Sequence, residues 1–270
     1  MTTLRTTAST LCAAALAAVL GSACAATVQG TVPPGTLQPD KFLFDRGTQA
    51  LAERRWLTAR EYFRELVETY TQSPLRPEGK LGLGDTYMGE GNAASYVLAI
   101  NEFGEFLAYY PTHARADYAQ YQLAMAHFEQ MRSAGRDQTE TKSSIREFEL
   151  FLTRYPNSSL TADVQAKLRE ARDRLSENDF IVGRFYYRIR WYPGAVDRLS
   201  TLLKDDPQYS GRDAVYYYLG ESLLRMNREA EALPYFERLV AEFEQSEHLQ
   251  DAQRRIAELR AARTASTSTP

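Results

Sequence analysis

One apolar pattern recurs five times along the chain and limits the folds that it can adopt. In residues 145–156 the apolar side chains are three and four positions apart, at Ile145, Phe148, Phe151 and Leu152. That spacing places them on one face of a helix, and Pro156 ends the helix because proline lacks a backbone N–H group. The same spacing recurs in residues 59–70, 100–111, 196–207 and 232–243. The sequence therefore predicts five similar amphipathic helices.

Small residues indicate that each of these helices is the second of a pair. In three repeats a glycine lies twelve positions before an alanine (59−47, 195−183 and 232−220): Gly47 and Ala59, Gly183 and Ala195, Gly220 and Ala232. Small residues allow two helices to cross closely, and a repeat of about 34 residues is typical of tetratricopeptide units. We therefore predict an all-α solenoid of about five tetratricopeptide-like helix-turn-helix repeats over residues 41–262.

Two of the repeats contain additional residues, 89–95 and 133–141, which we expect to form longer surface turns. Between the third and fourth repeats, apolar residues continue at helical spacing from about residue 160 to residue 190. This predicts one long helix, with a break at residues 176–178 as the alternative. The solenoid is thereby divided into an N-terminal half, residues 41–159, and a C-terminal half, residues 160–262. Residues 264–270 are small and polar, which predicts a disordered tail over residues 263–270.

The first 23 residues have the composition of an export signal. A single cation, Arg5, precedes an apolar run at residues 11–20 that is too short to span a bilayer as a mature helix. Two interpretations of its cleavage remain open: lipid attachment at Cys24, or release of a soluble protein that begins at Ala26. We favour lipidation, because a cysteine at the mature N-terminus can accept acyl chains that anchor the protein stably. Residues 24–40 predict a flexible tether.

The composition argues against catalysis, metal binding and nucleic-acid binding. The formal net charge is −3, whereas binding a nucleic-acid backbone requires clustered Lys and Arg. The three histidines, His113, His127 and His248, are far apart and have no carboxylate at metal-ligand spacing. Both cysteines precede residue 25, so the later chain has no thiol ligand. We therefore predict a protein that is not an enzyme and that needs no cofactor or metal.

A solenoid of this kind offers partners its concave wall, which the first helices usually line. Here those helices carry many tyrosines, and we expect most of them to pack between repeats. A minority facing the groove would suit peptide recognition, because tyrosine combines a rigid ring with a hydrogen-bonding tip. The candidates for the groove are Tyr87, Tyr118, Tyr121 and Tyr186.

Residues 144–207 contain sequence blocks that are similar to the BamD family of outer-membrane assembly lipoproteins. The most specific blocks are Tyr-Pro-Asn-Ser at residues 155–158, Phe-Tyr-Tyr at residues 185–187 and Trp-Tyr at residues 191–192. The resemblance implies a non-catalytic subunit of the machinery that inserts β-barrel proteins, lipid-anchored at the periplasmic face of the outer membrane. The implied partners are the periplasmic domains of the central barrel protein, other assembly lipoproteins and unfolded β-barrel clients.

The resemblance implies that the C-terminal repeats dock on the barrel protein and that the N-terminal repeats receive a client signal segment. The resemblance assigns barrel contact to Arg198, and we add Arg188, Trp191 and Tyr192 from the same block. An intramolecular pair of Arg198 with Asp197 or Glu221 is the alternative. The alternative function is a soluble periplasmic tetratricopeptide scaffold of a Tol-type envelope or division complex.

Overall fold

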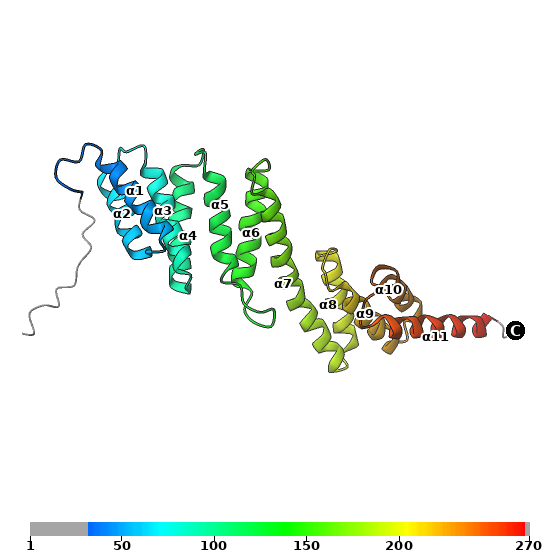
Figure 1. The fold of residues 1–270 in the computed structure, drawn as a ribbon. Helices are drawn as coiled ribbons and strands as arrows, with labels where there is room; N and C mark the ends of the chain where they lie inside the picture. Colours follow the sequence, from blue (N-terminus) through cyan, green and yellow to red (C-terminus); the bar gives the residue numbers. More distant parts are fainter. Residues whose placement is uncertain (1–31, 268–270) are drawn as a thin grey trace, which may run out of the picture.

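The computed structural model describes residues 32–267, with side chains to residue 264. The export signal, Cys24 and residues 25–31 of the tether lie outside the described residues. This part of the chain is helical throughout (Figure 1). The helices are α1 (Pro39–Ala52), α2 (Trp56–Thr69), α3 (Arg76–Glu90), α4 (Ala93–Tyr109), α5 (Ala116–Phe128), α6 (Thr139–Arg154), α7 (Thr161–Arg188), α8 (Tyr192–Asp205), α9 (Arg212–Arg225), α10 (Glu229–Glu242) and α11 (Leu249–Thr267).

The helices form five successive pairs, from α1/α2 to α9/α10, and α11 covers the last pair. Each helix packs mainly against its neighbours in the sequence (Figure 1). Helices α1–α6 stand side by side, and α7 leads from them to α8–α11 at the other end of the molecule. A helix pair cannot bury its apolar face alone, so stacking of pairs builds the core. The predicted all-α solenoid is confirmed.

The small residues lie where the helices of a pair cross. A Cβ atom added to Gly47 would lie 2.7 Å from the ring of Phe63, and one added to Gly220 would lie 2.6 Å from Phe236. Gly183 meets Leu199 in the same way, at 2.5 Å. These distances leave no room for a methyl group, which explains why this position is glycine in all three units.

The same three units share one turn geometry. Their first helices end with a residue in the left-handed conformation: Arg54 (φ 57°), Arg190 (φ 65°) and Asn227 (φ 58°). In each turn the next amide donates back to a helix carbonyl, as Trp191 N does to Tyr186 O at 2.9 Å. This is the Schellman arrangement, which closes a helix and lets the next one begin within two residues. The turn therefore fixes the spacing of twelve.

A polar clip joins the two ends of units one, three and five. An aspartate in the first turn of the first helix accepts a hydrogen bond from a serine hydroxyl in the turn after the second helix: Asp40 from Ser73 at 2.7 Å, Asp117 from Ser158 at 2.6 Å, and Asp213 from Ser246 at 2.6 Å. Each clip therefore fixes the start of a unit to the turn that leads into the next helix. The clip partners are about a repeat apart, so helical periodicity does not reveal them.

Three sequence predictions change in detail. Residues 89–95 mostly lengthen helices rather than a turn, because Gly91 (φ 69°) and Asn92, which accepts from Ser95 N, connect α3 to α4 directly. Helix α7 runs unbroken for 28 residues, so the alternative break at residues 176–178 is wrong. Helix α11 continues to Thr267, so the predicted disordered tail is not found over residues 263–267. Alanine and arginine favour helix there, and no glycine or proline intervenes.

Candidate partner-docking surface

Large apolar side chains are exposed where α7 ends and α8 begins. Phe185 is 45% exposed, and Ile189 and Trp191 are each 53% exposed. The left-handed Arg190 turns the chain back, which seats the Trp191 indole edge-on against Tyr186 with ring centroids 4.7 Å apart. Gly194 lies directly beneath the indole, and a Cβ atom there would collide with it. We call the residues Phe185, Tyr186, Tyr187, Ile189, Trp191 and Tyr192 the aromatic elbow.

The aromatic elbow borders a cavity of about 710 Å³ that is lined by α7 side chains and by Tyr218 of α9. Tyr187 lines this cavity and packs edge-on against Tyr218 (5.1 Å), which also lines it, and against Tyr192 (5.9 Å). The Arg188 guanidinium lies 5.6 Å from the Phe185 ring. Arg188 forms no ion pair within the part of the chain that the structure describes. A solvated cation beside exposed rings is suited to an acidic and apolar partner.

A second, more acidic cavity of about 480 Å³ lies on the other side of α7, between α6 and the end of α8. Arg198 stands near it and reaches Asp179 at 3.8 Å. The alternative, an ion pair of Arg198 with Asp197 or Glu221, is therefore wrong. Arg198 pairs with Asp179 instead, and Glu221 pairs with Arg255 at 2.5 Å. Burial raises the pKa of Asp179, and the neighbouring charge of Asp205 raises it further while Arg198 opposes the shift.

The structure brings four of the predicted site residues together. Tyr186, Arg188, Trp191 and Tyr192 all belong to the α7–α8 corner. Arg198 lies seven residues after Trp191, which places it two turns further along the same face of α8. The site residues that sequence reasoning missed are Phe185 and Ile189. Three consecutive aromatic residues at 185–187 were a signal, because neighbouring side chains on a helix point about 100° apart and cannot all face the core.

The remaining tyrosine candidates lie in the N-terminal half. Tyr87 is only 7% exposed and Arg60 stacks on its ring at 3.9 Å, which removes it from the groove candidates. The Tyr118 hydroxyl donates to Asp85 at 2.8 Å, and the Tyr121 hydroxyl donates to Asp163 at 2.7 Å. Both rings remain partly exposed. These hydroxyls bridge neighbouring repeats, as the packing interpretation of most tyrosines expected.

Residues 32–267 contain no group of three or more His, Cys, Asp or Glu side chains that could hold a metal ion. No helix in the same range is both long and apolar enough to cross a membrane. The helical repeats define a tetratricopeptide-like solenoid, and the exposed aromatic corner is its candidate docking surface.

The chain matches the YfiO family model, described as an outer membrane lipoprotein, over residues 37–232. It belongs to this family, which confirms the resemblance seen in the sequence.

Several curated relatives are each named outer membrane protein assembly factor BamD. The protein of Caulobacter vibrioides is 28% identical over 225 residues, covering 82% of this chain and 72% of the relative. That of Rickettsia prowazekii is 24% identical and covers 73% of this chain and 77% of the relative. Among solved structures, the TPR2AB-domain:pHSP90 complex of yeast Sti1 covers 85% of this chain and 86% of its own, at 15% identity and a TM-score of 0.47.

Proposed function

We propose that this protein is a non-catalytic scaffold lipoprotein of the outer-membrane β-barrel assembly machinery, whose C-terminal half binds the periplasmic domains of the central barrel protein. Family membership supports the assembly role, because relatives are named outer membrane protein assembly factors. The observation that carries the docking site is the aromatic elbow, where Phe185, Ile189 and Trp191 are exposed together beside Arg188. Other assembly lipoproteins are further partners under this proposal.

The side chains of the aromatic elbow determine which surface of the barrel protein would be complementary. The aromatic elbow offers rings and a cation, so the complementary surface carries an apolar side chain flanked by a carboxylate. Arg198 adds a second cation two turns along α8, held only by a 3.8 Å pair that a better-placed carboxylate can replace. Large aromatic side chains and arginines contribute most to protein interfaces, so Trp191 and Arg198 are the expected anchors.

Co-purification from detergent-solubilised outer membranes tests the docking site. Trp191→Ala is expected to weaken recovery of the barrel protein by at least about tenfold, because a central aromatic anchor contributes about 2 kcal/mol. Arg198→Glu is expected to weaken it as well, through repulsion of the partner's carboxylate. The matched control is Arg64→Glu on α2, an exposed arginine at the opposite end of the solenoid. Unchanged recovery with folded Trp191→Ala and Arg198→Glu proteins would remove the aromatic elbow from the proposal.

Unfolded β-barrel clients are the second part of the proposal, received by the N-terminal half through Tyr118 and Tyr121. Their hydroxyls are already engaged by Asp85 and Asp163, so a client strand has to use the ring faces. Tyr121→Phe should therefore keep the affinity for a labelled C-terminal peptide of a barrel protein, whereas Tyr121→Ala should reduce it. Equal binding by both variants would exclude Tyr121.

Membrane attachment at Cys24 completes the proposal and places the solenoid at the periplasmic face of the outer membrane. Mass spectrometry of the mature N-terminus distinguishes it from the soluble periplasmic scaffold. An acylated Cys24 supports the anchor, whereas a free N-terminus at Ala26 supports the soluble alternative. Cys24→Ser is expected to release the protein from the outer-membrane fraction.

A further inference from the structure

Helix α7 is two first helices joined end to end. Aligning Gly183 with Gly47 places Ser176 at the position that Asp40 occupies in unit one. The corresponding helices start one residue before that position, at Pro39 in α1, Ala116 in α5 and Arg212 in α9. Helix α7 starts much earlier, at Thr161, and its 28 residues are twice the 14 of α1. Its first part covers α6, and its second part is the first helix of unit four, with no second helix between them.

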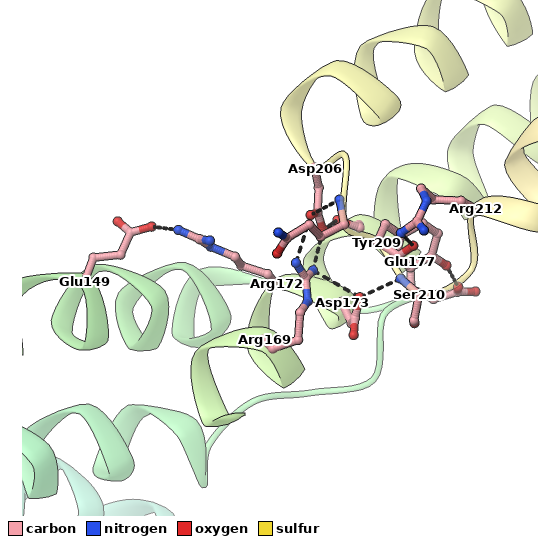
Figure 2. Close-up of polar contacts among 11 residues, drawn as sticks. Glu149, Arg169, Arg172, Asp173, Glu177, Asp206, Tyr209, Ser210 and Arg212 are labelled. Atoms are coloured by element: carbon pink, nitrogen blue, oxygen red, sulfur yellow. Dashed lines mark hydrogen bonds and ion pairs between the residues drawn. The ribbon is translucent and has the colours of Figure 1, made fainter. Parts of the chain in front are cut away.

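Polar contacts gather on α7 at this fusion point and tie it to the turn between α8 and α9 (Figure 2). Asp206 receives both Arg169 terminal nitrogens, at 2.9 and 2.5 Å, and the Ser176 hydroxyl at 2.6 Å. Asp173 accepts from Arg169 at 3.0 Å and from Ser210 N at 2.9 Å. The Tyr209 hydroxyl donates to Glu177. We call Arg169, Asp173, Ser176, Glu177, Asp206, Tyr209 and Ser210 the brace.

The brace lies where the other units of the solenoid have an aromatic side chain. The residue that ends the second helix of every other unit is aromatic: Tyr70, Tyr110, Tyr155 and Phe243. Unit four has Asp206 at this position. Apolar packing tolerates sliding, whereas a bidentate carboxylate–guanidinium pair requires one geometry. Among the five residues that end the second helices, Asp206 therefore makes the most directional contact with its unit's first helix.

The N-terminal half holds the other side of the same part of α7 through the α5–α6 loop, residues 129–138. The buried Gln138 amide shapes this loop by donating to the carbonyls of Ser133, Ala134 and Arg136. The loop then accepts from α7, at Ala134 O from Asn178 Nδ2 (2.6 Å) and at Arg132 O from Arg174 (3.2 Å). The insertion seen in the sequence is therefore a fixed support for α7.

We infer that the brace and the α5–α6 loop act as a joint that fixes the angle between the two halves of the solenoid. Arg169, Ser176 and Asp206 are its central positioning residues. Loss of Asp206 removes the three hydrogen bonds that it accepts from Arg169 and Ser176, which loosens the α8–α9 turn on α7 and lets the C-terminal repeats vary their angle to the fused helix. Given the proposed function, this joint sets where the aromatic elbow stands relative to the client-binding half.

Spin-label distance measurements on the full mature chain test the joint without any partner. The chain after Cys24 contains no cysteine, so labels can be placed at Glu68→Cys in α2 and Glu244→Cys after α10, both exposed. With an intact brace we expect a single narrow distance distribution. Asp206→Ala is expected to broaden and shift it, with helix content unchanged by circular dichroism.

Arg172→Ala is the matched control, because this arginine lies one turn from Arg169 but pairs with Glu149 of α6 instead (Figure 2). It should leave the distribution narrow. Ser176→Ala, which removes one hydrogen bond, provides a milder variant if Asp206→Ala does not fold, and it should broaden the distribution to a smaller degree. A folded Asp206→Ala protein with the wild-type distribution would overturn the inference. Failure of the docking proposal would leave this measurement unaffected.

Discussion

Replacing Gly220 with alanine should destabilise the C-terminal half, although alanine is the better helix former. The new Cβ atom would lie 2.6 Å from Phe236 Cζ and 2.9 Å from two further ring atoms. Phe236 is fully buried, so the ring cannot move aside without disturbing its neighbours. Overpacking of this kind costs up to about 3 kcal/mol, and the gain in helix propensity returns about 1 kcal/mol. We therefore expect a net loss of about 2 kcal/mol in the free energy of unfolding.

Gly104→Ala is the control for this prediction, since it makes the same substitution inside α4. The nearest side-chain atom to its added Cβ is Leu123 Cδ1 at 3.9 Å, an ordinary contact. Only the propensity gain applies there, so the variant should be more stable by about 1 kcal/mol. Urea unfolding followed by far-ultraviolet circular dichroism measures both variants. Stabilisation by Gly220→Ala would refute the argument that close helix crossing requires glycine.

Three further substitutions have expected signs. Burial raises the pKa of Asp85 to about 6, so its contribution to stability is present below about pH 4 and is lost as the pH rises through 6. Asp85→Asn, which can still accept from Tyr118, should therefore raise the unfolding free energy by about 2 kcal/mol at neutral pH and leave it unchanged near pH 4. Arg54→Gly should stabilise by about 0.5–1 kcal/mol, since only glycine adopts φ 57° without strain, whereas Arg54→Ala should have no effect. Arg255→Leu should cost about 3 kcal/mol because it leaves the buried Glu221 carboxylate unpaired, and adding Glu221→Leu should recover most of that loss. Urea unfolding measures all three.

The periodic part of the fold could be predicted from the sequence because one constraint repeats. An apolar helix recurs in each unit, and a glycine at a crossing and a left-handed turn recur in units one, four and five, so Gly47, Gly183 and Gly220 report the same geometry three times. The aromatic corner was predicted in part, since Trp191 and Tyr192 stand in a block similar to the family. The exposure of Phe185 and Ile189 depends on the left-handed turn at Arg190. The helix propensities of single residues do not predict that turn.

The polar contacts between units could not be predicted in this way. Asp40 and Ser73, or Arg169 and Asp206, are more than thirty positions apart (73−40 and 206−169), and charged residues on helices are usually solvated. Only the assembled solenoid shows which of them face another unit. The same limit explains why Asp179, the partner of Arg198, was missed in favour of Asp197 and Glu221.

The fusion within α7 has a consequence for how the two halves communicate. An ordinary solenoid distributes its flexibility over many equivalent apolar interfaces, each with neighbours on both sides. Here no second helix follows residue 175 as it would in a regular repeat, so the interface between the halves consists of one continuous helix and the contacts that hold it. Beside apolar packing, those contacts include the ionic and directional brace, which ends on the turn that follows Arg198 and Asp205. A partner that engages these two residues would bind next to the joint, and mutation of Asp206 should alter partner binding through geometry even though Asp206 is turned towards Arg169.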